Sequence, residues 1–191
     1  MDFLPAALRP AVVRSVDGGG ALLLLSLSII GAAFLFVREE GGPGSQERIR
    51  LSATFESPEA VARAVVAGLR GGELAGLKRL ALTEAEFRDL VWPKLPASRP
   101  ERNLPMDYVW GDLAGKSDAN LRARLGGWQD RGFVLVSVSF KGGVEDYGTF
   151  KVHRDSVLIL KDREGREQTG RLFGSILEHQ GRFKVFSYVV D

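Results

Sequence analysis

The 191-residue chain contains no cysteine and only two histidines. The absence of cysteine excludes disulfide scaffolds, thiolate zinc and iron–sulfur sites, c-type haem attachment, a cysteine nucleophile and a bacterial lipoprotein anchor. The net charge is only +2, with 26 Lys and Arg interleaved among 24 Asp and Glu, which gives no electrostatic reason to expect nucleic acid as a partner. An apolar content of 45% is too high for a disordered chain, and the length suits one globular domain with an appendage.

Motifs of catalysis and of phosphate binding are also missing. The glycine pairs at 71–72, 126–127 and 142–143 lack the Lys or the third Gly that a phosphate-binding loop needs. The sequence has no GxSxG elbow, no HExxH and no acidic calcium loop. We therefore expect no metal site, and the sequence names no substrate.

One long hydrophobic run lies near the N-terminus. Residues 21–37 read ALLLLSLSIIGAAFLFV without a charge, and at about 1.5 Å per residue a helix over 18–38 is long enough to cross a bilayer. Only Ser26 and Ser28 interrupt its apolar surface, which argues against a buried amphipathic helix. The run contains no ionisable residue, so we expect it to bind no cofactor directly, and its contacts with lipid or pigment are left open. We predict a single transmembrane helix that acts as an anchor.

A cleavable signal peptide is the alternative interpretation of this run. The best small-residue cleavage pattern is Gly31, Ala32 and Ala33, and cutting there would leave the apolar segment 34–37 as a new N-terminus. We therefore favour an uncleaved helix, in which the same three small residues form a patch where another transmembrane helix can approach closely.

The segments on either side of the helix predict its orientation. Arg9 and Arg14 lie in the tail of residues 1–17, whereas a Gly-rich linker, 39–50, follows the helix and carries few cations near the membrane. The positive-inside rule then places the N-terminus in the cytoplasm and the C-terminal domain in the periplasm of a bacterial inner membrane. The absence of cysteine agrees with an exported domain.

Residues 51–191 read as one soluble domain that begins with helices. Ser57 before Pro58 is a helix N-cap, and Thr83 with Glu86 forms a capping box. Glycine or proline follows most of the periodic segments and ends them. The sequence predicts helices over 58–71, 74–82, 83–92 and 117–128.

A segment rich in proline and aromatic residues, 92–116, separates the last two predicted helices. It holds half of the 8 prolines, and we expect an irregular loop because such long connections serve as binding loops, lids or packed crossings. Trp92, Tyr108 and Trp110 are its candidate partner-binding residues, since aromatic side chains supply contact area at low entropic cost. The alternative is that they form a hydrophobic plug beneath the loop.

The remainder of the domain has the two-residue period of strands. Val134, Val136, Val138 and Phe140 alternate with polar residues and are expected to face the core. Further strands are predicted over 147–161, with a bend near 154–155, and over 168–178 and 183–190, separated by tight turns. Helices followed by an antiparallel meander predict an α+β fold, in which helices pack on a curved four-stranded antiparallel sheet.

This order of elements resembles the nuclear transport factor two-like, or cystatin-like, superfamily of cone-shaped α+β domains. The resemblance covers about 51–191 and rests on the long first helix, the capped helix from Thr83 and four late strands that end in FKVFSYVVD. It implies a cone whose open end holds a small ligand, an enzyme site or nothing. Such domains also serve as dimerisation or assembly modules in bacterial envelope proteins, so the fold does not settle the function.

Few residues are candidates for catalysis. His153 could act as a general base opposite a carboxylate such as Asp107, Asp112 or Asp146. In the hydratases and isomerases that the chain resembles, an Asp or His and a Tyr line the cone, and Asp107, Tyr108 and His153 could take those parts here. The simpler interpretation is that His153 belongs to a polar outer strand face. The other histidine, in the turn before the last strand, reads as a solvated residue.

Two functions follow from these observations. The first is a single-span accessory subunit that stabilises a larger bacterial membrane complex, with a photosynthetic reaction centre and its light-harvesting ring as a candidate. Its partners would be other subunits and lipid. The alternative is a membrane-anchored small-ligand-binding protein, or an enzyme of the isomerase or hydratase kind, that uses the cone pocket.

Overall fold

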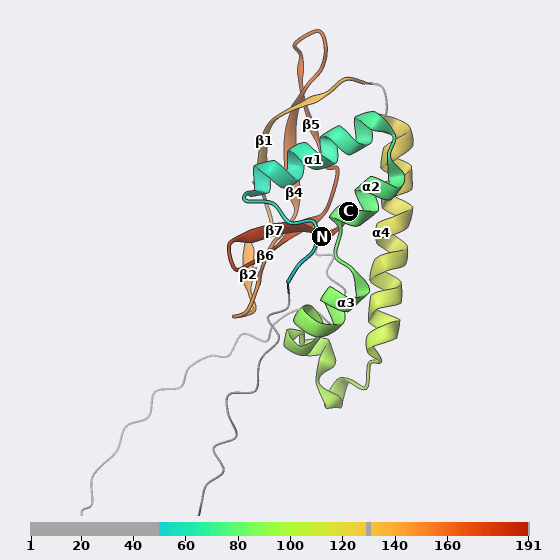
Figure 1. Ribbon diagram of the computed structural model, residues 1–191, viewed down its shortest axis with the longest axis vertical. Coiled ribbons are helices and arrows are strands. Elements are labelled where there is room, and N and C mark those ends of the chain that lie inside the picture. Colours follow the sequence, from blue (N-terminus) through green and yellow to red (C-terminus); the bar gives the residue numbers. More distant parts are fainter. Residues whose placement is uncertain (1–49, 129–130, 191) are drawn as a thin grey trace, which may run out of the picture. The chain divides into compact units, whose positions relative to one another are not determined.

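The computed structural model describes residues 50–128 and 131–190, in which the helices precede the strands (Figure 1). Helix α1, Pro58–Gly71, begins and ends where its caps predict. The Ser57 hydroxyl accepts a hydrogen bond from the amide of Ala60 at 3.1 Å, and Gly72 ends the helix with a positive φ of 67°. The buried face of α1 consists of Val61, Ala62, Val65, Val66 and Leu69.

The capping box after helix α2, Leu74–Leu80, is also confirmed. The Thr83 hydroxyl accepts from the amide of Glu86, and the Glu86 carboxylate accepts from the amide of Thr83 at 2.8 Å. The helix that it opens is irregular, because α3, Glu84–Glu86, widens into a π-helical turn over Phe87–Val91. Three short 3-10 turns follow, Trp92–Lys94, Pro96–Ser98 and Pro100–Arg102, each with a proline in its first positions, where no amide donor is needed.

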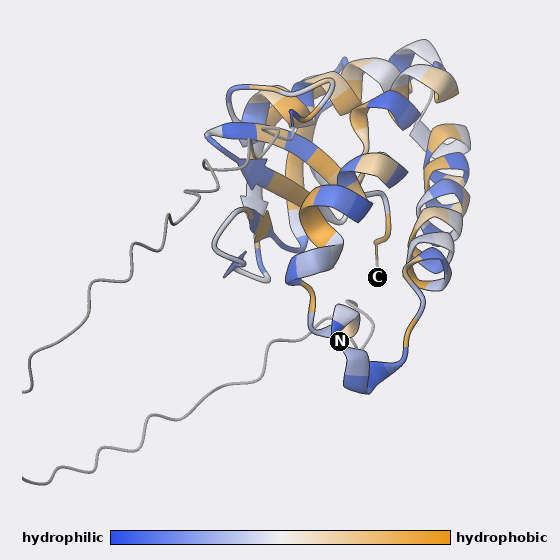
Figure 2. Ribbon diagram, turned by 60° about the horizontal axis from the view of Figure 1, so that its bottom comes forward, coloured by the Kyte–Doolittle hydropathy of each residue, from blue (hydrophilic) through white to orange (hydrophobic). Residues whose placement is uncertain are grey.

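The predicted loop over 92–116 is wrong in its second half. Helix α4 runs over Met106–Trp128, so the irregular segment ends at Pro105, and Ser117 and Asp118 lie inside the helix instead of capping it. Few side chains of α4 face the core, since only Val109 and Leu121 are buried. Polar and weakly hydrophobic residues occupy much of its length (Figure 2). The periodic apolar signal was therefore too weak to reveal the first half of this helix.

The strands form two antiparallel sheets. The first has the order β1-β4-β5 and the second the order β2-β3-β6-β7. Their bounds are β1 Val134–Phe140, β2 Val144–Asp146, β3 Lys151–His153, β4 Ser156–Lys161, β5 Glu167–Gly170, β6 Ser175–His179 and β7 Arg182–Ser187. The α+β class and the antiparallel pairing are thus confirmed. The predicted single sheet of four strands is wrong: the predicted strands over 147–161 and 168–178 are each broken in two, the first at the expected bend at 154–155, and β2 was not predicted.

Two glycines near these breaks lie too close to other parts of the chain for a side chain to fit. A Cβ atom on Gly142 would collide with the carboxylate of Asp155, and one on Gly174 would collide with the carbonyl oxygen of Val189. Asp155 itself has a positive φ of 55°. The chain therefore turns from one sheet into the other at positions where a larger side chain does not fit.

The predicted inward face of β1 is wrong at its first two valines. Val134 and Val136 are each 49% exposed. The register with β4 shifts between Leu135 and Ser137, so Val136 is the extra residue of a bulge. Leu135, Val138 and Phe140 instead pack against the core. A single bulge reverses which residues face inward, because strand side chains alternate with a period of two.

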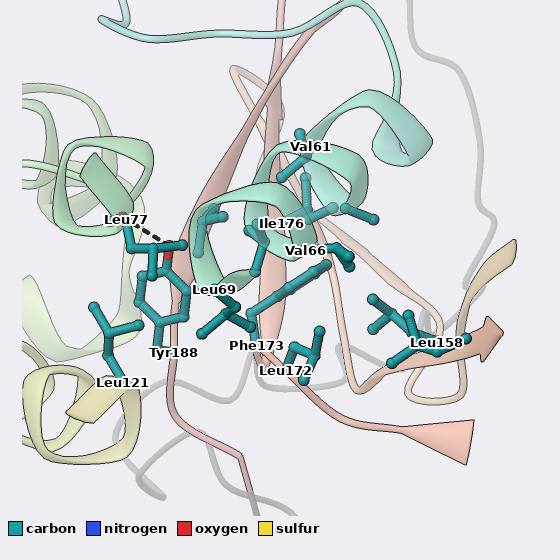
Figure 3. Close-up of a cluster of buried hydrophobic side chains, with 14 of the residues drawn as sticks. Val61, Val66, Leu69, Leu77, Leu121, Leu158, Leu172, Phe173, Ile176 and Tyr188 are labelled. Atoms are coloured by element: carbon teal, nitrogen blue, oxygen red, sulfur yellow. Dashed lines mark hydrogen bonds between the residues drawn. The ribbon is translucent and has the colours of Figure 1, made fainter. Parts of the chain in front are cut away.

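The core consists of two hydrophobic clusters. The first packs α1 against Leu158, Leu172 and Phe173 (Figure 3). The second packs the π-helical turn and the proline-rich turns against Phe150, Val152, Leu177 and Phe186. The sheet β2-β3-β6-β7 contributes alternate residues to both: Ile176 and Val185 to the first, Val152 and Leu177 to the second. This sheet is therefore covered on both faces.

The predicted transmembrane segment, 18–38, lies outside the described residues. Among the helices of 50–128 and 131–190, none combines the length and the apolar character needed to cross a membrane.

Candidate functional site

The structure pairs His153 with a carboxylate that the sequence did not indicate. Its Nε2 atom lies 2.8 Å from Oε2 of Glu178 on the neighbouring strand β6. The imidazole ring packs between Phe140 and Phe183, with centroid distances of 5.3 and 5.9 Å. His179 has its Nδ1 atom 2.8 Å from the carbonyl oxygen of Thr149. Both histidines thus have local contacts across the second sheet.

The carboxylates proposed as partners of His153 have other neighbours. Asp112 accepts from Lys116 at 2.7 Å along α4, and Asp146 accepts from the amide of Gly148 at 2.7 Å. Asp107 and Tyr108 lie in the first turn of α4, where both are exposed. No hydrogen bond between described residues joins any of them to His153.

The interior of the domain contains large apolar side chains at positions that matter for the alternative function of binding a small ligand. Phe150 is only 2% exposed, Leu172 and Phe186 are buried as well, and Phe183 is partly buried. These large apolar side chains occupy part of the interior of the described domain. Within 50–128 and 131–190, moreover, no group of three or more His, Asp or Glu is placed to hold a metal ion.

The three aromatic candidates for partner binding do not share one environment. Trp92 and Trp110 both contact the buried ring of Phe87, at centroid distances of 6.2 and 5.3 Å, and both pack against the second core cluster. Tyr108 is 68% exposed. The two tryptophans thus pack into the domain, as the alternative of a hydrophobic plug beneath the loop predicted. Tyr108 is a surface residue.

Tyr108 belongs to a face of α4 that is exposed in the described part of the chain. We call this the outer face of α4 and define it by Tyr108, Gly111, Gly115, Ala119 and Gly126, all exposed and all on one side at helical spacing. A Cβ atom added at any of its three glycines would meet nothing within 4 Å. Internal packing therefore does not require glycine here.

A surface hollow lies on the inner side of α4. It has a volume of about 140 Å³ and is lined by Lys78 of α2, by residues of α4 that include Trp110 and Leu113, by Phe186 of β7 and by Tyr188, which follows β7. The polar groups of Tyr188 are used internally: its hydroxyl donates to the carbonyl of Leu77 at 2.7 Å (Figure 3), and its amide donates to the Ser117 hydroxyl. These groups are therefore already engaged within the domain and are not available to orient a ligand.

An ion pair lines the same hollow. Nζ of Lys78 lies 2.6 Å from Oδ1 of Asp118. The hydrogen bond from Lys78 holds the pKa of the Asp118 carboxyl below its ordinary value. This pair ties α2 to α4 across the surface.

Sequence reasoning missed a buried cation on β7. Lys184 has 0% exposure, and its ammonium lies 2.8 Å from Oε2 of Glu86. It also donates to the carbonyl oxygen of Ser52 at 2.8 Å and to the Ser52 hydroxyl at 2.9 Å. The only sequence signal was the Thr83–Glu86 capping box, which places the carboxylate; nothing in the local pattern FKVFSYV showed that Lys184 faces inward.

Glu86 is the centre of this network, which we call the Ser52 clamp and define by Ser52, Glu86 and Lys184. Its Oε1 atom accepts from the amide of Ser52 at 2.6 Å and from the Ser52 hydroxyl at 2.9 Å, while its Oε2 atom accepts the capping bond from the amide of Thr83. Burial raises the pKa of Glu86, but the hydrogen bonds from Lys184 and from the amides of Thr83 and Ser52 outweigh it, so the pKa lies below its ordinary value. The clamp holds the first residues of the domain on its core.

Comparison of the chain with protein-family models, with curated proteins and with solved structures finds no match.

Proposed function

We propose that the protein is a membrane-anchored accessory subunit of a larger bacterial complex. In this proposal the helix over 18–38 crosses the inner membrane with its N-terminus in the cytoplasm. The domain over 51–191 then lies in the periplasm and binds another subunit through the outer face of α4.

The observation that carries this proposal is the composition of the outer face. Glycine inside a helix is less stable than alanine by about 0.5 to 1 kcal/mol. No packing inside the described domain offsets this cost at Gly111 and Gly115, because a methyl group at either position would have no neighbouring atom within 4 Å. Small residues at a spacing of four let a second helix approach the backbone closely, and the exposed ring of Tyr108 adds an aromatic anchor at one end.

The Ser52 clamp supports a location close to the membrane. Ser52 is held on the domain by Glu86 and Lys184, so the tether that we propose between the membrane and the domain ends there. The predicted linker has 12 residues, 39–50, and a Gly-rich chain of that length has an average end-to-end distance of about 20 Å. A domain on such a tether can reach only proteins at or near the membrane surface.

The proposal is tested by changing Gly111→Ala and Gly115→Ala together in the full chain. Because the glycines have no internal role, we expect the domain to become more stable by about 1 to 2 kcal/mol. The added methyl groups should at the same time separate the helix from its partner. Blue-native electrophoresis of solubilised membranes should then show loss of the large species that the unaltered chain forms.

The matched control is Gly127→Ala. Gly127 also has free space around it but is turned by about 100° from Tyr108 around the helix. We expect this variant to be slightly more stable and fully assembled. Migration of the unaltered chain as a single 20.9 kDa species, or full assembly of the double variant, would contradict the proposal.

A further inference from the structure

Strand β1 has an outer edge that no described strand pairs with. This strand is the edge of the sheet β1-β4-β5, and α1 crosses one face of that sheet (Figure 1). Residues 133–140 read FVLVSVSF, eight uncharged residues with high strand propensity. Within the described residues, the backbone of β1 is hydrogen-bonded only to β4. Its outward amides and carbonyls are therefore available to another strand.

The other sheet edges of the described domain are protected. Strand β2 has three residues and carries Glu145 and Asp146, and β5 has four residues and carries Glu167. The edge of β7 is covered, because Phe55 and Ala81 form bridges to Phe183 and Val185. Short edges, charges and covering segments are the usual means by which proteins prevent strand addition. Strand β1 has seven residues and no charge, and no described segment pairs with its outer edge; it carries a bulge at Val136, which leaves the pairing of 137–140 regular.

The charges around β1 indicate what kind of strand it accepts. Arg131 precedes the strand and Lys141 follows it, both exposed and neither in an ion pair with a described residue. If a second copy paired antiparallel with β1, Arg131 of each copy would come toward Lys141 of the other. A parallel pair would bring identical cations together. Both arrangements oppose like charges, which disfavours a second copy.

We propose that β1 binds an extended, uncharged segment of another protein that is flanked by acidic residues, by adding it as a fourth strand to the sheet β1-β4-β5. The main-chain bonds to β1 would supply affinity, and the exposed side chains of Val134 and Val136 would pack against small or β-branched side chains of the added strand. Arg131 and Lys141 would select acidic flanks. This surface is separate in sequence from α4 and does not depend on the function proposed above.

The probe for this proposal is a synthetic ten-residue peptide with a Ser-Val-Thr-Val-Ser-Val centre and an Asp-Glu pair at each end. Binding to the full chain in detergent is measured by fluorescence anisotropy of the labelled peptide. Two N-methylated forms of the peptide, each blocking alternate amides, serve as controls for main-chain pairing. We expect one N-methylated form to bind at least tenfold more weakly than the parent peptide, because only one set of amides faces β1.

The charge requirement is tested with the double variant Arg131→Glu and Lys141→Glu. Both positions are exposed, so the domain should keep its circular dichroism spectrum. We expect the acidic peptide to bind the double variant at least tenfold more weakly than it binds the unaltered chain. A peptide with Lys in place of Asp and Glu should bind the double variant at least tenfold more tightly than it binds the unaltered chain. The proposal is overturned if the unaltered chain does not bind the acidic peptide, if both N-methylated forms bind like the parent, or if the chain dimerises through β1 instead. The N-methylated peptides need only the unaltered chain, so they test pairing even if the double variant does not fold.

Discussion

Replacement of Lys184 by methionine tests the Ser52 clamp directly. Methionine fills a similar volume but removes the ammonium that lies 2.8 Å from both the Glu86 carboxylate and the carbonyl of Ser52. The carboxylate of Glu86 would keep its hydrogen bonds from Ser52 and Thr83 but would stay buried without a counter-charge. Removal of one partner of a buried ion pair costs about 3 to 5 kcal/mol, a large part of the roughly 5 to 15 kcal/mol by which a domain is stable.

The double variant Glu86→Gln with Lys184→Met should be less damaging than the sum of its parts. A glutamine carries no charge, and its carbonyl oxygen can still accept from the amide of Thr83. The expected cost is then that of the lost hydrogen bonds, about 1 to 2 kcal/mol. The double-mutant cycle should therefore show a coupling energy of at least about 2 kcal/mol, because Glu86→Gln alone also leaves the Lys184 ammonium buried without its counter-charge.

The assay is urea unfolding of the full chain in detergent, followed by tryptophan fluorescence. All three tryptophans, Trp92, Trp110 and Trp128, lie in the described domain, so the signal reports its unfolding alone. Lys161→Met is the matched control, because Lys161 is an exposed strand lysine and its loss should change stability by less than about 0.5 kcal/mol. A cost of Lys184→Met no larger than that of the control, or a double variant less stable than both single variants, would show that the Ser52 clamp does not stabilise the domain in this way.

Two further predictions concern the same domain. Because the pKa of Glu86 in the folded state lies below its ordinary value of 4.5, its contribution to stability is present above about pH 4.5 and is lost as the pH falls through the folded pKa. The unfolding free energy of Glu86→Gln should therefore fall less steeply with acid than that of the unaltered chain, and parallel acid titrations of the two would contradict this. Trp110→Ala should destabilise the domain by about 2 to 4 kcal/mol because its ring packs on Phe87, whereas Tyr108→Ala should leave stability within about 0.5 kcal/mol and weaken assembly. Equal effects of the two substitutions on urea unfolding would show that the assignment of Trp110 to the core is incorrect.

Local signals in the sequence predicted the parts of the fold that depend on a few adjacent residues. A cap is formed by side chains and amides within three positions, so Ser57 and the Thr83–Glu86 pair could be recognised without any tertiary information. The tight turn before β7 and the bend at 154–155 were visible for the same reason. The exposed or buried state of the aromatic candidates was not, because it depends on Phe87, which lies about 20 residues away from Trp110 in the chain.

Long-range packing decided the remainder. Four glycines in α4 weaken the local helix signal, and the helix forms because Val109 and Leu121 pack against elements distant in sequence. The bulge in β1 depends on pairing with β4, and it turned two valines outward that alternation had placed inside. Lys184 is buried only because Ser52 and Glu86, 132 and 98 positions away, arrive to bind its ammonium. A charged residue in a strand reads as solvent-facing from the sequence, since its burial is stable only when the tertiary structure supplies the opposite charge and the hydrogen-bond acceptors.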